Sequence, residues 1–447
     1  MELTNQRQKV SLSLLKKDAE TGKPLEGVVF GLYAQEDIKN AAGEVVVEKD
    51  ALIELGTTDE EGKLVFQADL PHGKYYIQEV EHKPGYLPND EVYSFDASYT
   101  DQTLELLAFS EEISNQPTIT EFTKVDLTGG QEIEGAKMQI LDQEGKVVEE
   151  WVSKKEAHVV YALAPGEYIL HEEQAPTEQG YVRAEDVKFV VEETGDVQKV
   201  KMEDDHTKVS ISKTDITDGK EIEGAKLQIL DQDGEVVESW TTGEEHLIEY
   251  LPVGTYTLHE EAAVDGYIVA NDVEFTVEET GEIQKVKMED ERAMGQLVIV
   301  KTDTDSKAAL EGVEFVLLEK ETGKEVGRLK TGKDGKAVSE LLPIGTYENG
   351  VFKEPITYVL KETATLKGYE KTEEEWEIVF TYQNDKTPVI EVVKEIQNKK
   401  IPETPGTVKP GPKTGDDTNW FLPLLALGVS AGMVAGLLYY RKRHKKA

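Results

Sequence analysis

Residues 209–213 read Val-Ser-Ile-Ser-Lys, an alternating run that closes on a lysine. Because side chains two positions apart share one face of a β-strand, Lys213 points to the same side as Val209 and Ile211. The same pattern occurs three more times, at the lysines Lys16, Lys124 and Lys301. Each of the four lysines is therefore expected to face a hydrophobic core.

Two further polar positions follow each lysine and obey the same two-residue rule. The first is the glutamate of a Tyr-x-Ile/Leu-x-Glu strand, at Glu79, Glu172, Glu260 and Glu362. The second ends a later strand, at Asn115, Asp204, Asp290 and Asn398. The order lysine, glutamate, Asn or Asp is thus repeated four times, and each set is expected to be buried together.

Burial changes the chemistry of these groups. Desolvation favours the neutral amine and the neutral acid, with pKa shifts of about 3 to 5 in fully buried sites. A neutral lysine can attack the side-chain carbonyl of Asn or protonated Asp, releasing ammonia or water, while the glutamate transfers protons. A single Lys–Glu pair is more often a salt bridge, but fourfold recurrence favours chemistry. The predicted isopeptide bonds are Lys16–Asn115, Lys124–Asp204, Lys213–Asp290 and Lys301–Asn398.

The spacing of the repeat indicates several small β-domains. At 447 residues the chain exceeds a single core, and Lys124, Lys213 and Lys301 lie 89 and 88 positions apart. Short runs of Val, Ile, Tyr and Thr alternate with turn signals such as Asp233-Gly234, which is typical of antiparallel strands in a sandwich. The outer repeats carry insertions around residues 40–50 and 348–354. Fibronectin III or immunoglobulin sandwiches would share this periodicity, so the polar sets distinguish the candidates.

Several longer motifs support a family resemblance. Residues 16–27 read Lys-Lys-Asp-Ala-Glu-Thr-Gly-Lys-Pro-Leu-Glu-Gly, and Lys301-Thr-Asp is followed by Leu-Glu-Gly-Val-Glu-Phe at 310–315. Residues 358–369 are similar to the pilin E-box, with Leu366 in place of its usual proline. From residue 7 to 400 the chain resembles the Cna B-type (SpaA-like, prealbumin-like) domains of Gram-positive adhesins and pilins. The resemblance implies Ig-like β-sandwiches and assigns the crosslinking roles argued above.

The C-terminal segment resembles a sortase-processed anchor. Residues 421–440 form an apolar run long enough to cross a bilayer, and the basic residues 441–446 follow it. Upstream, Gly411 precedes Pro412-Lys413-Thr414-Gly415, which is similar to an LPxTG-like sortase signal with glycine in place of leucine. The resemblance implies cleavage after Thr414 and attachment of its carboxyl group to a cell-wall amine. A simple C-terminal membrane anchor is the alternative.

Composition excludes several classes of function. The formal net charge of −40 disfavours nucleic acid as a partner. The absence of cysteine leaves the predicted amides as the substitute for extracellular disulfides. His171 and His259 have no second ligand at metal-binding spacing, and Asp231-Gln-Asp-Gly234 is better explained as a hairpin turn than as a calcium loop. We therefore expect no metal, no cofactor and no enzymatic turnover of an external substrate.

The sequence thus predicts a cell-wall-anchored surface protein, an adhesin or stalk. The expected partners are sortase and peptidoglycan, with host extracellular matrix or other pilins beyond them. A minor or basal pilin, or a carbohydrate-binding module, is the alternative. The N-terminus lacks the apolar core of a signal peptide, so the chain is expected to be a fragment, a mature-like form or a sequence with a wrongly assigned start. The expected segments are an N-terminal stub (1–7), Cna B-type domains (8–117, 118–206, 207–293, 294–400), a Pro/Gly spacer with the sortase signal (401–415), and a transmembrane helix with its tail (416–447).

Overall fold

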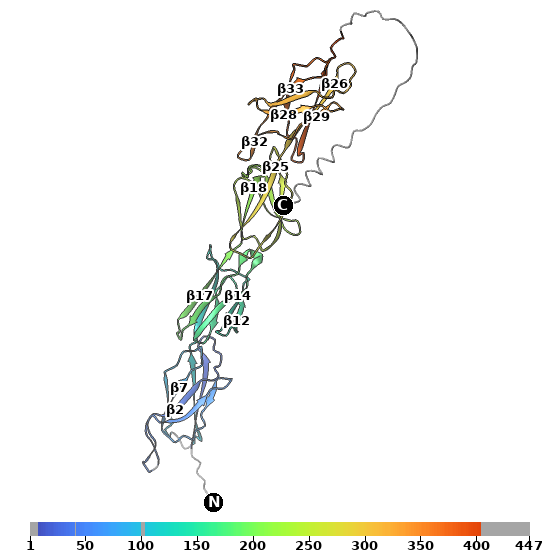
Figure 1. The fold of residues 1–447 in the computed structure, drawn as a ribbon. Helices are drawn as coiled ribbons and strands as arrows, with labels where there is room; N and C mark the ends of the chain where they lie inside the picture. The colour runs from blue at the N-terminus through green and yellow to red at the C-terminus, as the bar shows by residue number, and fades with distance from the viewer. Residues whose placement is uncertain (1–7, 41, 100–102, 404–447) are drawn as a thin grey trace, which may run out of the picture.

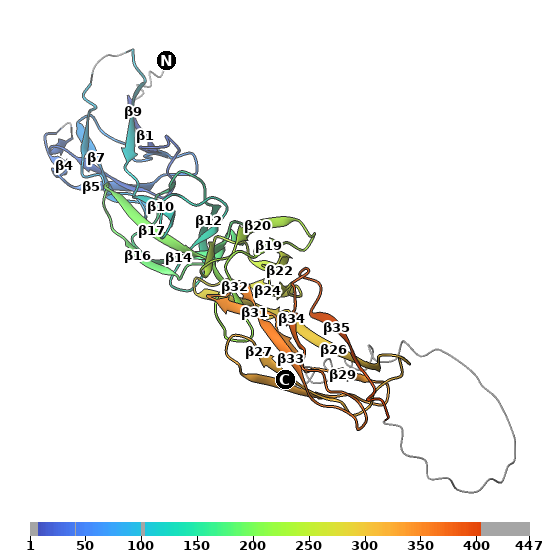
Figure 2. The ribbon, with the colours of Figure 1, turned by 90° about the horizontal axis from the view of Figure 1, so that it is seen from above.

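The computed structural model of the chain describes residues 8–40, 42–99 and 103–403. These residues form four units that follow one another in a row (Figure 1), and the view turned by 90° shows the same succession (Figure 2). Every unit contains two main β-sheets, which confirms the predicted all-β tandem array. The predicted sortase signal and transmembrane helix lie outside the described residues. Within the described ranges, no helix is long and apolar enough to cross a membrane.

Unit 1 extends from β1 to β9. Its two sheets have the strand orders β6-β1-β9 and β5-β2-β7-β8, and β3 and β4 form a separate hairpin at the predicted insertion. The strands are β1 (Lys9–Asp18), β2 (Val29–Ala34), β3 (Ile38–Lys39), β4 (Val45–Val47), β5 (Leu52–Thr57), β6 (Lys63–Val65), β7 (Lys74–Glu81), β8 (Val92–Asp96) and β9 (Leu106–Asn115).

Units 2 and 3 share one topology. Unit 2 has the sheets β13-β10-β17-β15 and β12-β11-β14-β16, and unit 3 has β21-β18-β25-β23 and β20-β19-β22-β24. The elements of unit 2 are β10 (Ile119–Asp126), β11 (Lys137–Leu141), β12 (Val147–Val152), β13 (His158–Tyr161), β14 (Gly166–Gln174), the 3-10 turn η1 (Thr177–Gln179), β15 (Tyr181–Val182), β16 (Val187–Val191) and β17 (Val197–His206). Those of unit 3 are β18 (Lys208–Asp215), β19 (Lys226–Leu230), β20 (Val236–Thr241), β21 (His246–Glu249), β22 (Gly254–Ala262), β23 (Tyr267–Ile268), β24 (Val273–Val277) and β25 (Ile283–Arg292).

Unit 4 extends from β26 to β35. One sheet pairs β26 with β29, β30 and β35, the other has the order β28-β27-β33-β34, and the β31–β32 hairpin occupies the second predicted insertion. The strands are β26 (Met294–Asp303), β27 (Glu314–Glu319), β28 (Glu325–Lys330), β29 (Lys336–Val338), β30 (Leu342–Pro343), β31 (Gly345–Glu348), β32 (Val351–Pro355), β33 (Thr357–Ala364), β34 (Glu375–Val379) and β35 (Val389–Asn398).

The first and last strands of every unit lie side by side and run parallel, whereas the other strand pairings in the described residues are antiparallel. These parallel pairs are β1 with β9, β10 with β17, β18 with β25, and β26 with β35. An alternating pattern reports which face a side chain occupies but not the direction of the neighbouring strand, so the antiparallel strands predicted from the turn signals do not include these four pairs. The parallel pairing brings the ends of the first and last strands together.

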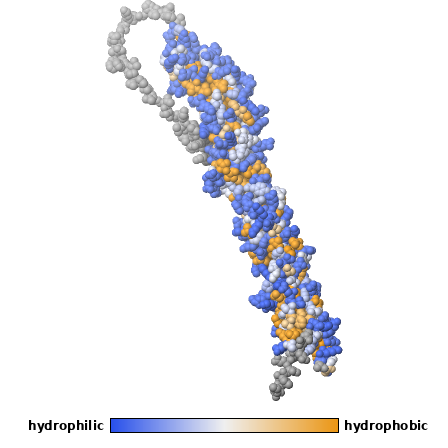
Figure 3. Space-filling view, turned by 180° about the vertical axis from the view of Figure 1, so that it is seen from behind, coloured by the Kyte–Doolittle hydropathy of each residue, from blue (hydrophilic) through white to orange (hydrophobic). Residues whose placement is uncertain are grey.

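Each unit has its own hydrophobic core between its two sheets. The inward side chains of the first strand contribute to it, as Leu12 and Leu14 do in unit 1 and Leu297 and Ile299 do in unit 4. Hydrophilic residues dominate the face of the molecule drawn in Figure 3, with apolar residues in separate patches. The buried side chains nevertheless include polar ones, among them all four predicted lysines.

Candidate crosslinking sites

The structure brings the three predicted residues together in every unit. The lysine lies on the first strand, the glutamate on the central strand β7, β14, β22 or β33 of the opposite sheet, and the Asn or Asp on the last strand. In unit 1, Lys16 is paired in register with Ile113, so Asn115 lies two residues further along β9 on the same face. The same offset recurs in the other units, where the lysines pair with Met202, Met288 and Ile396.

The lysine of each set contacts both acidic or amide partners. The distance from its Nζ atom to the glutamate Oε2 is 2.8 Å in units 1 and 4 and 2.9 Å in units 2 and 3. The Nζ also donates a hydrogen bond to the Oδ1 of the Asn or Asp in all four units. The four lysines are at most 3% exposed, and the glutamate side chains likewise. Parity along the strand therefore predicted the inward direction of these groups correctly.

In units 1 and 4 the third residue is an asparagine whose amide group faces the glutamate. Asn115 donates from Nδ2 to the two oxygens of Glu79 at 2.9 and 3.0 Å. Asn398 donates to Glu362 at 2.7 Å and to the hydroxyl of Thr365 at 2.8 Å. In both units the amide nitrogen points to the carboxylate while the amide oxygen points to the lysine.

Burial changes the pKa of the lysine in units 1 and 4, the two units whose third residue is an asparagine. It lowers the pKa of Lys16 and of Lys301, while the neighbouring glutamate carboxylates act in the opposite direction. The ring of Phe30 lies 5.3 Å from Lys16 Nζ, and the ring of Phe315 lies 5.7 Å from Lys301 Nζ. A lysine enclosed by apolar and aromatic groups gives up its proton more readily than one in water, which makes its amine nucleophilic.

In units 2 and 3 the third residue is an aspartate that is held close to the glutamate. Burial raises the pKa of Asp204 and of Asp290 to about 7, opposed by the charge of the lysine and reinforced by the glutamate. In unit 2, Asp204 Oδ2 and Glu172 Oε1 are buried and have no hydrogen-bond partner among the described residues. One proton placed between the two carboxyl groups would satisfy both oxygens.

Backbone N–H groups orient the glutamates of units 2 and 3. Glu172 Oε2 accepts a hydrogen bond from the N–H of Ala184 at 2.7 Å, and Glu260 Oε2 accepts one from Ala270 at 2.6 Å. These donors lie on the segment that leads into the next edge strand. Backbone groups leave no residue-type signal in a sequence, so only the fold could identify them.

A second buried set lies beside each lysine and was missed in the sequence. An aspartate two residues after the lysine accepts a hydrogen bond from the tyrosine of a Gly-Tyr pair, with Tyr86 to Asp18 at 2.8 Å and Tyr267 to Asp215 at 2.7 Å. Units 2 and 4 repeat this contact with Tyr181–Asp126 and Tyr369–Asp303. The spacing Lys-x-Asp and the Gly-Tyr pairs recur four times, so repeat comparison could have found them.

The remaining candidates lie apart from the crosslinking sets. His171 and His259 are partly exposed and contact Asp186 and Asp272, each at 2.7 Å. In the described part of the chain, no group of three or more metal-binding side chains is gathered in one place. The sortase-signal residues Pro412 to Gly415 lie outside the described residues.

The geometry is compatible with amide formation. Each set places a buried amine beside a carboxamide or carboxyl group, with a second carboxyl group positioned to accept and return protons. Holding reacting groups in contact in a dry site can supply on the order of 7 to 11 kcal/mol toward a barrier. The same atoms could instead form a buried ion pair, and covalent analysis distinguishes the two.

Comparison with known proteins identifies related domains. A family model described as SpaA, a prealbumin-like fold domain, matches residues 10–109, 118–206, 207–292 and 295–355. Among solved structures, the Bacillus anthracis TIE protein is 22% identical over 88% of this chain and 73% of its own, with a TM-score of 0.45. BcpA, the major pilin subunit of Bacillus cereus, is 15% identical over 64% of this chain and 100% of its own, with a TM-score of 0.28. No curated protein matches the chain.

Proposed function

Because the chain belongs to the family of SpaA prealbumin-like fold domains, we propose that it is a bacterial surface protein whose units are closed by self-formed isopeptide bonds. It acts as a stalk or adhesin attached to the cell wall. The observation that carries this proposal is the buried lysine, glutamate and Asn or Asp set, which recurs with the same geometry in all four units.

The proposed reaction uses groups that the chain itself supplies. In units 1 and 4 the lysine Nζ attacks Cγ of the asparagine, a new N–C bond forms, and the amide nitrogen leaves as ammonia. In units 2 and 3 the attack is on the protonated aspartate, and the lost group is water. The glutamate accepts the proton of the attacking amine and returns it to the leaving group, so no external reagent is needed. Each unit reacts once.

The mass of the intact protein tests this proposal. Two losses of ammonia and two of water lower the mass by about 70 Da relative to the sequence, a covalent change that persists in denaturant. We expect tryptic digestion to yield four branched peptides, one for each predicted pair. A mass equal to that of the unmodified chain would reject the covalent proposal and leave four buried ion pairs in a surface protein of the same fold.

Bond formation in units 2 and 3 is expected to depend on pH. The carboxyl groups of Asp204 and Asp290, with pKa values raised to about 7, keep their protons below that pH and lose them above it. Because a carboxylate is a poor electrophile, the rate in these units relative to the asparagine units should fall as pH rises through about 7.

This pH dependence can be measured by refolding. Chains that have not yet reacted, recovered from inclusion bodies in denaturant and shown by their mass to be unmodified, are diluted into buffers across that pH range, and the four branched peptides are quantified over time. Units 1 and 4 serve as matched controls because their asparagines carry no titrating proton. A constant ratio at all pH values would contradict a reaction that passes through the protonated aspartate.

Attachment to the cell wall is proposed from the sequence of the C-terminal segment. Sortase and peptidoglycan are the expected partners there, with Thr414 at the point of transfer. A minor or basal pilin is the alternative, since it would contain the same kind of domain and have other pilins as partners. Cell-wall extracts separate the two candidates, because a pilin gives ladders of high molecular weight that disappear without sortase.

A further inference from the structure

The joint between units 2 and 3 is short and closely packed. Strand β17 ends at His206 and β18 begins at Lys208, so Thr207 is the single connecting residue. The N–H of Thr207 donates a hydrogen bond to the carbonyl oxygen of Gly180 at 2.8 Å. Gly180 has a φ angle of +79°, and a Cβ there would lie 2.4 Å from backbone atoms of Tyr250 in unit 3. Only glycine permits this approach, so the two units touch directly.

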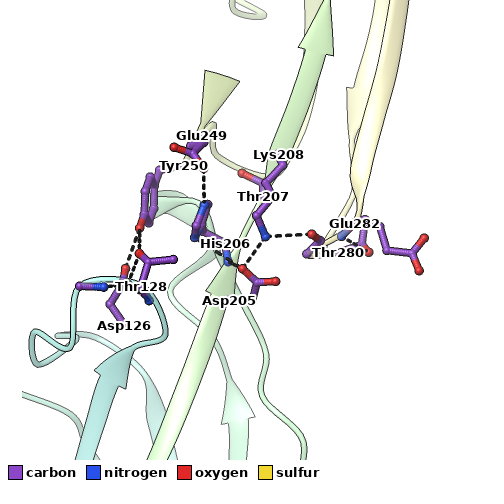
Figure 4. A network of polar contacts seen from close by, with 12 residues as sticks. Asp126, Thr128, Asp205, His206, Thr207, Lys208, Glu249, Tyr250, Thr280 and Glu282 are labelled. Carbon is purple, nitrogen blue, oxygen red and sulfur yellow. Dashed lines mark hydrogen bonds and ion pairs between the residues drawn. The ribbon is translucent and has the colours of Figure 1, made fainter. Parts of the chain in front are cut away.

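A buried histidine lies at the centre of this joint (Figure 4). His206 is 1% exposed, and its ring stacks on that of Tyr250, with centroids 3.9 Å apart and an interplanar angle of 16°. Its Nε2 atom lies 3.2 Å from Glu249 Oε1 of unit 3, and its Nδ1 atom lies 3.5 Å from Asp205 Oδ1 of unit 2. The imidazole therefore has one carboxylate near each nitrogen, and these carboxylates come from different units.

Protonation determines whether both nitrogens are satisfied. A neutral imidazole has one N–H, so one nitrogen must remain an acceptor beside a carboxylate. In this geometry Nδ1 of His206 is buried and has no hydrogen-bond partner among the described residues. The protonated ring has two N–H donors, can serve Asp205 and Glu249 together, and gains a cation–π contact with Tyr250.

Other charged and titratable groups also lie around His206. Lys208 donates to Asp205 at 2.6 Å, so this ammonium group already has a partner. The Tyr250 hydroxyl donates to Asp126 at 2.8 Å, and burial raises the pKa of Tyr250. Although burial alone would raise the pKa of Asp126, its hydrogen bonds hold that pKa well below the usual range. The neighbouring Tyr181 contributes a ring edge, 5.6 Å from Tyr250 between centroids.

The three joints differ at the position of His206. In each joint the N–H of the first residue of the next unit donates to the carbonyl of a Gly-Tyr pair at 2.8 Å. The residues before these donors are Pro117, His206 and Arg292. The Arg292 guanidinium lies 4.2 Å from the ring centroid of Tyr347 in unit 4 and donates to Asp215 at 2.6 Å. At this position the joint between units 1 and 2 has a neutral residue, the joint between units 2 and 3 has a titratable residue, and the joint between units 3 and 4 has a permanent cation.

We propose that the joint between units 2 and 3 is a pH-dependent hinge that protonation of His206 closes. Because the closed joint places a carboxylate near each ring nitrogen, it favours the protonated imidazole, so the contact is favoured in acid and weakens as the ring loses its proton. The closed joint holds the proton of His206 more tightly than the open joint does. The closed joint is therefore favoured at low pH and loses this advantage as the pH rises. The hinge lies outside the crosslinking sites and does not depend on them.

Distances between spin labels on units 2 and 3 test the hinge directly. The chain has no cysteine, so Lys188→Cys on β16 and Glu274→Cys on β24 provide two unique exposed labelling sites. We expect the distance distribution to shift from the closed joint toward the open joint between about pH 5.5 and about pH 8, because only the closed joint offers a carboxylate to both nitrogens of the protonated ring. Identical distance distributions at the two pH values would overturn the proposal.

Two variants and one neighbouring joint serve as controls. His206→Phe keeps the aromatic stack without a charge and should leave the joint open at both pH values. His206→Arg introduces the permanent cation of the next joint and should keep it closed at both. Labels at Glu274→Cys and Glu377→Cys, which report on the Arg292 joint, should show no pH response. An equal response there would assign the effect to the general charge of the protein and reject the hinge. Should either variant fail to fold, the doubly labelled chain with His206 intact still decides the question.

Discussion

Replacing Glu172 by Gln is expected to abolish the isopeptide bond of unit 2 and to leave that of unit 3 intact. Glutamine keeps the volume of the glutamate, and its amide oxygen can still accept the Ala184 N–H. It cannot take the proton of the attacking Lys124 amine, however. General acid–base groups typically contribute about 10² to 10⁴ in rate, so unit 2 should remain unbonded on the timescale of folding and purification.

The near-identical third unit is the internal control for this experiment. The mass of the Glu172→Gln protein should show one water fewer lost, and the Lys124–Asp204 branched peptide should be missing while Lys213–Asp290 remains. The reciprocal Glu260→Gln change should produce the opposite result. A full yield of the unit 2 branched peptide in the Glu172→Gln protein would show that the glutamate has no part in the reaction.

Replacing Asn398 by Ala is expected to lower the stability of unit 4 by about 4 to 5 kcal/mol, the chain-entropy value for closing a loop of this length. Lys301 and Asn398 are 97 positions apart. The substitution removes the carbon that the lysine attacks but keeps the ion pair between Lys301 and Glu362 at 2.8 Å. Most of the loss should therefore come from the missing bond rather than from an unpaired buried charge.

Calorimetry of the full chain measures this loss. For a domain of this size the unfolding midpoint of unit 4 should fall by roughly 20 °C, because each kcal/mol corresponds to several degrees. Asn115→Ala is the matched control, since it should move the transition of unit 1 and leave that of unit 4 in place. A shift of only a few degrees would match a lost hydrogen bond and speak against a covalent link.

Replacing Lys301 by Met tests the same bond in unit 4 from the side of the lysine. Lys301→Met also prevents the bond, but unlike Asn398→Ala it leaves Glu362 buried with no ammonium group beside it, a situation that costs about 3 to 5 kcal/mol. Its destabilisation should therefore exceed that of Asn398→Ala. Equal effects of the two substitutions would indicate that Glu362 is already neutral in the folded unit.

The sequence predicted those features that depend on the alternation of side chains along a strand. Lys213 follows Val209 and Ile211 on one face, and this parity alone placed it in the core. The parallel pairing of β18 with β25 could not be predicted this way, because alternation is the same in either direction. The Asp233-Gly234 pair correctly indicated a hairpin, because it joins the antiparallel strands β19 and β20.

Features that depend on contacts between distant backbone segments were not accessible from the sequence. The N–H of Ala184 orients Glu172, yet every residue except proline carries such a donor. The joint at His206 requires the relative placement of two units, and neither unit contains the complete network alone. By contrast, the Tyr86–Asp18 contact could have been found, since both of its residues recur at fixed positions in every repeat.

The parallel pairing of first and last strands determines how these units would carry tension. The chain enters each unit at one end and leaves at the other, so a pull on the whole rod acts along the two paired strands. In unit 1, a bond from Lys16 to Asn115 would transmit that load from β1 straight to the exit into the next unit. The intervening residues would bear none of it, and the rod could not lengthen by unravelling. Under tension, a protein with these bonds would keep its length, because none of its four units could extend by unfolding.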